Sequence, residues 1–371
     1  MKKHNRIITI IMGIAFMLLL VACGNNETSS SEGEVNAEEN DEQVYKLTMN
    51  SQLTPAVEGT PTHLGTVGFI ERVNERTDGR VEIEVFYNNQ LAGQSESLDA
   101  LARGTIDFQV TSPVSWADRI PEGDGGNLPF AFQGEEFVQH LLRETEFGSL
   151  YHEALEDYGV KPLHYFHTAS AGYLTTKPIA SADDFSGVVL SGPSPKVSDY
   201  YSSLGAGVAS VSFADYYEAL LRGTIDGITF PYYSLETYGL HEVVDYITVP
   251  GEVDPALSMM VVSLEAWNKL PADLQGIVYD VAMEIEQETM ELSKEFTKSG
   301  IEFARENGIE VIEMTEEAYN ELRQKGKETY WEDFAQQNER TAKMVDALVG
   351  AIEEYEESSG RSYDDYLEIY R

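Results

Sequence analysis

The octapeptide Ala100-Leu-Ala-Arg-Gly-Thr-Ile-Asp107 recurs as Ala219-Leu-Leu-Arg-Gly-Thr-Ile-Asp226, with seven of eight positions identical. Each copy has the pattern of a helix end, a glycine in the left-handed cap position and a β-branched entry into a strand. Gly104 and Gly223 can take a positive φ without a Cβ clash, so the chain can reverse there at little cost. Two such helix-to-strand joints predict two α/β domains of related design, with a cleft between them that can hold a small molecule.

The sequence around the repeats continues the α/β pattern. Residues 45–50 read as a first strand, and residues 81–86 alternate between apolar and acidic side chains as a half-buried strand does. Residues 135–158 are predicted as one amphipathic helix. A long helix is predicted from Pro271 to about Glu306, where an apolar stripe is flanked by acidic residues. A helix of this length that braces two lobes predicts one compact unit.

The N-terminus predicts export. Lys2, Lys3 and Arg6 precede an apolar run over residues 7–21, which is short for a membrane span and typical of a signal peptide covering residues 1–22. Leu20-Val-Ala-Cys23 resembles a bacterial lipobox, which implies a lipid on Cys23. Two acyl chains suffice for stable anchoring, so we expect a lipid-anchored protein at the cell membrane, facing the extracellular side. The alternative is an ordinary signal peptide that contains a cysteine.

Charge and cysteine content exclude several classes of protein. The net charge is −39, and no basic patch is present to neutralise phosphates, so we expect no nucleic-acid partner. Residues 23–44 are acidic and poor in apolar residues, and we predict a disordered tether before a folded region over residues 45–371. Because Cys23 is the only cysteine, no intrachain disulfide can form.

Motifs of enzymatic chemistry are absent from the sequence. It contains no Gly-x-Ser-x-Gly elbow, no His-Glu-x-x-His and no phosphate loop. His164 and His167 are spaced so that a strand places them on opposite faces, which disfavours a zinc site. We therefore predict a binding protein without catalytic residues, metal or cofactor. An exported hydrolase with an unrecognised site is the competing class.

Several short motifs follow one another between about Tyr45 and Met314: Gln90-Leu-Ala-Gly93, Gly104-Thr-Ile-Asp107, Leu128-Pro-Phe-Ala-Phe132, Asp184-Phe-Ser-Gly187, Ser212-Phe-Ala-Asp-Tyr-Tyr-Glu-Ala-Leu220, Gly223-Thr-Ile-Asp-Gly227 and Trp267-Asn-Lys-Leu-Pro-Ala-Asp-Leu274. In their order and spacing they resemble the DctP family, the extracytoplasmic solute receptors of TRAP transporters.

This resemblance implies a two-lobed, periplasmic-binding-protein-like α/β fold that closes on a small solute and delivers it to integral membrane TRAP permease subunits. We expect interleaved lobes over about 45–168 and 169–263, with helices over 264–371 packing on both.

The family's carboxylate-binding arginine is missing. By resemblance it falls on Ser191, in Asp184-Phe-Ser-Gly-Val-Val-Leu-Ser-Gly-Pro193, and a second arginine falls on Ser170 or Ala171. A guanidinium presents two donors that match a carboxylate, and neither a serine nor an alanine can replace it. A frequent family glutamate corresponds to Ser112.

The pocket residues implied by the resemblance are neutral and largely aromatic: Asn50, Ser112, Trp116, Ser191, Phe213, Phe230 and Tyr232. Aromatic faces and hydroxyls suit a neutral solute, or a cation through cation–π attraction. We therefore predict an uncharged or amine-bearing ligand. Two alternatives stay open: a carboxylate held by another basic residue such as Arg119 or Lys196, and a receptor that signals to a membrane kinase.

Overall fold

The computed structural model describes residues 43–192 and 194–371. Residues 43–371 form one compact unit. The predicted signal peptide, Cys23 and nearly all of the predicted tether lie outside the described residues. In the described part of the chain, no helix is long and apolar enough to cross a membrane.

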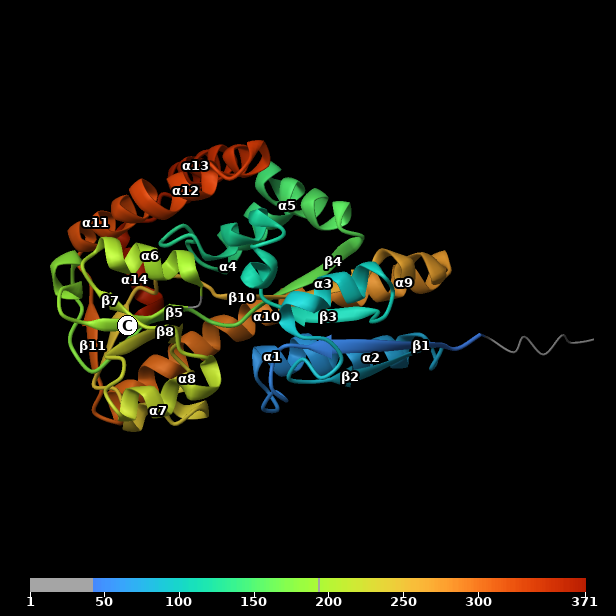
Figure 1. The fold of residues 1–371 in the computed structure, drawn as a ribbon, viewed down its shortest axis with the longest axis horizontal. Helices are drawn as coiled ribbons and strands as arrows, with labels where there is room; N and C mark the ends of the chain where they lie inside the picture. Colours follow the sequence, from blue (N-terminus) through green and yellow to red (C-terminus); the bar gives the residue numbers. More distant parts are fainter. Residues whose placement is uncertain (1–42, 193) are drawn as a thin grey trace, which may run out of the picture. The chain divides into compact units, whose positions relative to one another are not determined.

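The first sheet, sheet A, has the strand order β2-β1-β3-β10-β4 (Figure 1). β1 pairs in parallel with β2 and β3, whereas β10 runs antiparallel to both β3 and β4. The strands are β1 (Tyr45–Ser51), β2 (Val81–Phe86), β3 (Phe108–Thr111), β4 (Val160–His167) and β10 (Leu257–Ser263). β10 falls inside the range 169–263 predicted for the second lobe, yet it lies in sheet A because residues 250–256 lead the chain back.

The second sheet, sheet B, has the order β11-β9-β5-β8-β6-β7. β5 pairs antiparallel with β8 and β9, and the remaining pairs are parallel. Its strands are β5 (Ala171–Thr175), β6 (Val189–Ser191), β7 (Gly207–Val208), β8 (Gly227–Pro231), β9 (Tyr246–Val249) and β11 (Glu310–Glu313). The predicted α/β architecture with two related halves therefore takes the form of two mixed sheets.

The repeated octapeptide makes the same joint in both sheets. Helix α3 (Gln94–Ala102) leads into Gly104 with φ 63°, and α7 (Tyr216–Leu221) leads into Gly223 with φ 65°. The closing aspartate of each copy then accepts a hydrogen bond from a backbone N–H of the neighbouring parallel strand. Asp107 accepts from Thr48 in β1, and Asp226 from Val189 in β6, both at 2.8 Å.

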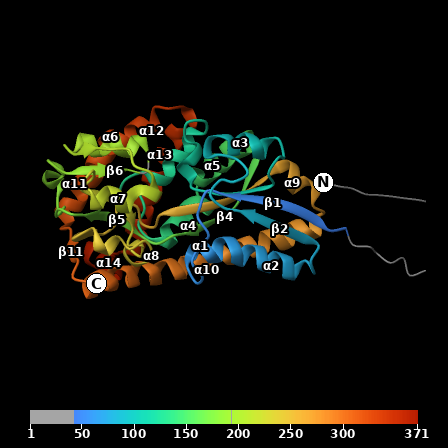
Figure 2. The same cartoon turned by 60° about the horizontal axis from the view of Figure 1, so that its bottom comes forward.

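Helix α10 (Ala272–Glu306) confirms the predicted long helix and packs on both sheets. Its first half contributes side chains from Leu274 to Ile285 to the core beneath sheet A. Its last turns contribute Ile301 and Ala304 to the core of sheet B. Figure 2 shows α10 running along one side of the molecule under strands of both sheets.

The helix predicted over residues 135–158 is two helices, α4 (Glu135–Glu144) and α5 (Glu146–Asp157). Thr145 breaks the helix because its backbone is extended, and its hydroxyl accepts a hydrogen bond from the N–H of Phe147 at 3.2 Å. The apolar periodicity continues across this residue, so the prediction missed the break. The side chains of both helices pack into a core that extends to sheet B.

Further helices cover the sheets and form the C-terminal region. They are α1 (Pro61–His63), α2 (Phe69–Arg76), α6 (Pro195–Ser203), α8 (Ser234–Thr237), α9 (Leu264–Lys269), α11 (Glu316–Gly326), α12 (Glu332–Ala335), α13 (Glu339–Ser359) and α14 (Tyr363–Leu367), followed by a 3-10 turn, η8 (Glu368–Tyr370). Figure 1 shows α11, α12 and α13 in succession along one edge of the molecule.

Candidate functional site

Ser191 lies at the end of β6, and its side chain is buried. Its hydroxyl oxygen accepts a hydrogen bond from the N–H of Val211 at 3.3 Å. The Tyr216 hydroxyl lies beside it and makes no hydrogen bond of regular length and angle to any of the described residues. Burial raises the pKa of that tyrosine to about 12, and the nearby Ser191 side chain partly offsets the effect. At Ser191, where the resemblance places the family arginine, the structure therefore has two neighbouring neutral hydroxyls.

Four rings from sheet B and its covering helices meet next to Ser191, and we call them the aromatic cluster: Phe213, Tyr216, Phe230 and Tyr238. The Phe230 ring lies 5.7 Å from Phe213, 5.6 Å from Tyr216 and 5.7 Å from Tyr238, measured between ring centroids. Phe213 and Tyr238 remain 55% and 52% exposed. Contiguous exposed apolar surface can mark a binding face, and these two rings are joined through Phe230.

Sheet A carries a polar counterpart at the end of β3. Ser112 is partly exposed and begins the short 3-10 turn η2 (Pro113–Trp116). The Gln52 side-chain oxygen accepts hydrogen bonds from the hydroxyls of Thr111 and Ser115, both at 2.8 Å. This arrangement fixes the amide group and leaves its nitrogen without a partner in the part of the chain that the structure describes.

Three of the predicted pocket residues are buried and bonded to protein groups. The Asn50 amide donates to the carbonyl of Ala92 at 3.0 Å and to Gln109 at 2.9 Å. The Trp116 indole donates to the Ser97 hydroxyl at 3.0 Å, and the Tyr232 hydroxyl donates to the carbonyl of Thr248 at 2.6 Å. The structure therefore groups Ser191, Phe213 and Phe230 together, and gives Asn50, Trp116 and Tyr232 hydrogen bonds within the fold.

The two basic residues considered as substitutes for the missing arginine both have acidic partners. Arg119 pairs with Asp99 at 2.9 Å, and Lys196 lies 3.8 Å from the buried carboxylate of Asp124. Neither pairing involves Ser191 or the aromatic cluster.

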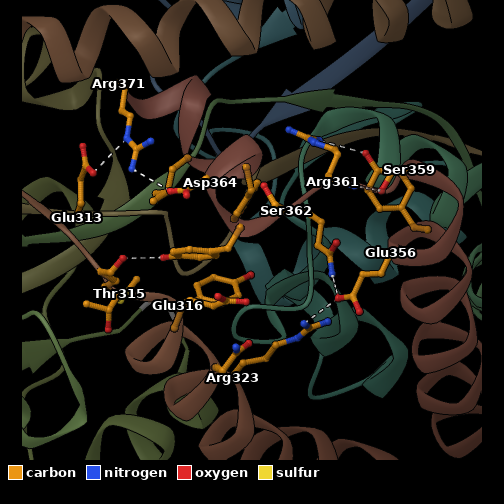
Figure 3. Close-up of a pocket in the computed structure, with 18 residues that line it drawn as sticks. Glu313, Thr315, Glu316, Arg323, Glu356, Ser359, Arg361, Ser362, Asp364 and Arg371 are labelled. Atoms are coloured by element: carbon orange, nitrogen blue, oxygen red, sulfur yellow. Dashed lines mark hydrogen bonds and ion pairs between the residues drawn. The ribbon is translucent and has the colours of Figure 1, made fainter.

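A cavity of about 790 Å³ opens between α11, α13 and the C-terminal turn, and three arginines line it (Figure 3). Arg323 pairs with Glu356 at 3.1 Å, and Arg371 with Glu313 at 3.3 Å. Arg361 contacts the Tyr355 hydroxyl at 3.4 Å. None of the predicted site residues lines this cavity, and acidic side chains already neutralise two of its arginines.

Metal-binding groups are likewise absent from the described residues, where no cluster of three or more His, Cys, Asp or Glu side chains can hold an ion. His164 and His167 are both buried, and burial lowers the pKa of each to about 3. His164 bonds the carbonyl oxygen of Gly65 at 3.1 Å and packs against Phe69, which is a structural role.

The model of the DctP family, described as bacterial extracellular solute-binding protein, family 7, matches residues 54–337. This chain belongs to the DctP family. A C4-dicarboxylate-binding periplasmic protein of Rhodobacter capsulatus is 26% identical over 261 residues, covering 70% of this chain and 78% of the relative. A C4-dicarboxylate-binding protein of Bacillus subtilis is 24% identical over 267 residues, covering 71% and 76% of the two chains.

Solved structures of TRAP periplasmic solute-binding proteins share the fold. One from Rhodoferax ferrireducens with bound malonate has a TM-score of 0.76 at 19% identity, covering 83% of this chain and 98% of its own. One from Chromohalobacter salexigens with bound D-glucuronate has a TM-score of 0.73 at 20% identity, covering 82% and 99%. The predicted fold and family are thereby confirmed, and the DctP chain is a TRAP extracytoplasmic solute receptor rather than an enzyme.

Sequence reasoning missed Tyr216, Tyr238 and Gln52. Tyr216 could have been found, because it follows Phe213 by three residues at the start of α7 and so lies on the same side of the turn. Tyr238 follows α8 after the helix has ended, and no pattern in the sequence connects it with Phe230. Gln52 is the residue after β1, and its role depends on hydroxyls that are distant in sequence.

Proposed function

We propose that this DctP receptor captures an uncharged or amine-bearing solute, with the aromatic cluster and Ser191 as its binding face on sheet B. The observation that carries the proposal is Ser191 itself. A buried hydroxyl with a tyrosine hydroxyl beside it offers hydrogen bonds but no positive charge to a carboxylate. A guanidinium at this position would supply the charge and the two-donor fork that a carboxylate requires.

The exposed rings of the aromatic cluster favour the same class of solute. Flat aromatic faces pack on sugar-like or aromatic neutral molecules, and they attract ammonium groups through cation–π interactions. The net charge of −39 adds a modest attraction for cations. From sheet A we propose that Ser112 and the free amide nitrogen of Gln52 complete the site. Asn50, Trp116 and Tyr232 would support it from behind.

The alternative is a carboxylate receptor that uses a different basic residue. Its support comes from the relatives, since the Rhodobacter and Bacillus proteins are named for C4-dicarboxylates and the solved structures hold malonate or D-glucuronate. For this chain, Arg119 or Lys196 would have to leave Asp99 or Asp124 to take part. The two possibilities predict opposite ligand preferences.

A thermal-shift screen of residues 24–371 distinguishes them. The panel sets mono- and dicarboxylates against amines, polyols and aromatic neutral molecules. A ligand at about 100 times its dissociation constant stabilises the protein by roughly 2.7 kcal/mol, which gives a clear rise in Tm. We expect amines or neutral solutes to raise Tm and carboxylates to have no effect.

Replacing Phe213 by alanine tests the location of the site. The variant should weaken binding of the best solute by about tenfold, because a stacking ring contributes roughly 1 to 2 kcal/mol. Tyr279→Ala is the matched control, since Tyr279 is also an exposed aromatic residue, 40% accessible on α10, outside the cluster. If both variants lost the same affinity for the solute, or if Phe213→Ala lost none, the site would lie elsewhere.

We also propose that the receptor is held at the cell surface by a lipid on Cys23, because Leu20-Val-Ala-Cys23 has the lipobox pattern. Two acyl chains anchor a protein stably, whereas a cleaved signal peptide alone would release it. We expect Cys23→Ala to move the protein from the membrane fraction to the soluble fraction. Retention of the variant in the membrane fraction would contradict the anchor.

A further inference from the structure

The chain passes between the two sheets three times, once through α10 and twice through short segments that lie side by side. Residues 168–170 join β4 to β5, and residues 250–256 join β9 to β10. The N–H of Ala171 donates to the carbonyl of Val253 at 2.9 Å, and the reverse bond measures 3.1 Å. The N–H of Ala256 donates to the carbonyl of Ala169 at 3.0 Å. We call these two segments the paired connections. Any change in the angle between the sheets must change the backbone conformation of these segments.

Helix α10 holds one of the paired connections in an unfavourable conformation. Ala169 has a φ of 77°, in the left-handed region that costs a residue with a Cβ about 1–2 kcal/mol. The Ser293 hydroxyl accepts a hydrogen bond from the N–H of Ala169 at 3.0 Å, and the Thr297 hydroxyl accepts one from the N–H of Ser170 at 2.9 Å. This backbone conformation persists because the two hydroxyls of α10 hold the N–H groups of Ala169 and Ser170.

The other connection carries a buried carboxylate, Asp254, which has no ion-pair partner among the described residues. One of its oxygens accepts a hydrogen bond from the Ser170 hydroxyl, so the carboxylate joins the two connections. Its second oxygen accepts from Tyr366 at 2.6 Å and from Tyr370 at 2.5 Å. Both tyrosines belong to the last eight residues of the chain, in α14 and η8.

The C-terminal segment that supplies these hydroxyls is itself attached on the side of sheet B. Arg305, in the last turn of α10, donates to the carbonyls of Tyr370 at 2.9 Å and Arg371 at 3.1 Å. Tyr363 donates to the carbonyl of Met314 at 2.9 Å. The segment lies beyond residue 337, where the match to the family model ends. The segment therefore gives the hinge a further fixed contact on the side of sheet B.

We propose that Tyr366 and Tyr370 are positioning residues, which hold the paired connections through Asp254 and thereby set the angle between the two lobes. A carboxylate buried without a cation needs its hydroxyl donors, so the tyrosines cannot leave without exposing or repacking it. The consequence for solute affinity rests on the proposed function. The effect on hinge geometry does not, because it exists without solute.

The test is a measurement of interlobe distance without ligand. Spin labels are placed on Glu84→Cys in β2 of sheet A and on Glu236→Cys in α8, a helix that packs in the core of sheet B, and both positions are exposed. The protein used for labelling is produced without residues 1–23. This deletion removes the only native cysteine and leaves the compact unit 43–371 intact. Tyr366→Phe/Tyr370→Phe removes only the two hydroxyls. Tyr151→Phe is the matched control, because its buried hydroxyl lies 3.4 Å from the carbonyl oxygen of Pro113 and contacts neither Asp254 nor the C-terminal segment.

We expect the double variant to show a second interlobe distance, populated above the roughly 10% typical of a minor state, while the control keeps the parent distribution. Identical distributions in the double variant and its parent would overturn the proposal. If the double variant does not fold, Tyr366→Phe alone is measured against the same control by the same criterion. A failure of the thermal-shift screen to find a neutral or amine solute would leave this result unaffected.

Discussion

The Tyr216 hydroxyl is buried beside Ser191 without a regular hydrogen bond among the described residues, and a solute that donates or accepts there would satisfy it. Tyr216→Phe should change the free energy of unfolding by less than about 1 kcal/mol, since the hydroxyl lies near Ser191 but makes no hydrogen bond of regular geometry within the described residues. Binding of the best solute from the screen should weaken about tenfold. Denaturant unfolding and calorimetric titration measure the two effects separately.

Tyr232→Phe is the control for this experiment. Its hydroxyl donates to the carbonyl of Thr248, so the same removal of one oxygen should destabilise the fold by about 1 kcal/mol and leave binding unchanged. If Tyr216→Phe destabilised the protein and bound solute normally, the hydroxyl would have a structural partner rather than a role in recognition.

Single residues also show the limits of prediction from this sequence. Ser191 is predicted from its position in a motif of fixed length, and the structure buries it at the end of β6. Asn50 and Trp116 were assigned in the same way, and their polar atoms bond to Gln109 and Ser97 instead. Hydrogen-bond partners that are distant in sequence decide whether a polar group is free for a ligand, and no local pattern reveals them.

Among the elements, α4 begins with a carboxylate whose protonation should affect stability. Glu135 is buried next to Asp254, and burial raises its pKa to about 8 from the ordinary 4.5. The folded protein therefore binds a proton that the unfolded chain releases between these values, so stability should fall as pH rises from about 4.5 to about 8 and then level off. One proton corresponds to a slope of at most about 1.4 kcal/mol per pH unit.

Urea unfolding at intervals between pH 5 and pH 9 tests this. Glu135→Gln should flatten the slope, because a glutamine can still accept the hydrogen bond from Ser293, at 2.8 Å in the native protein, and carries no charge. Glu144→Gln, at the exposed end of the same helix, should retain the slope of the parent. If the stability of Glu135→Gln depended on pH as strongly as that of the parent, other groups would be the cause of the dependence.

Regular elements were predicted where the signal is local. The cap glycines Gly104 and Gly223 mark both joints of the repeat, and the stripe of α10 spans the whole helix. The break at Thr145 was missed because the apolar period runs through it and one hydroxyl decides it. The aromatic cluster was predicted only in part, since the contact of Tyr238 with Phe230 forms when α8 packs beside β8.

For the whole molecule, the two-sheet architecture followed from the duplicated joint, but the path of the chain between the sheets did not. β10 returns to sheet A, and the C-terminal tyrosines reach back to Asp254 across more than 100 residues of sequence. Contacts between residues this far apart in the chain leave no periodic pattern in the sequence, so they could not be predicted from it. The second of these returns brings Tyr366 and Tyr370 to Asp254, and the proposed role of the two tyrosines depends on that contact.

The solute preference of the proposed binding face on sheet B is the central claim, and calorimetric titration of the wild-type protein tests it most directly. The titrants are the best neutral or amine solute from the screen and the analogue in which a carboxylate replaces its polar group. We predict that the carboxylate analogue binds at least about tenfold more weakly, a difference of roughly 1.4 kcal/mol. Tighter binding of the carboxylate would show that another basic residue replaces the missing arginine, and that Ser191 does not set the specificity.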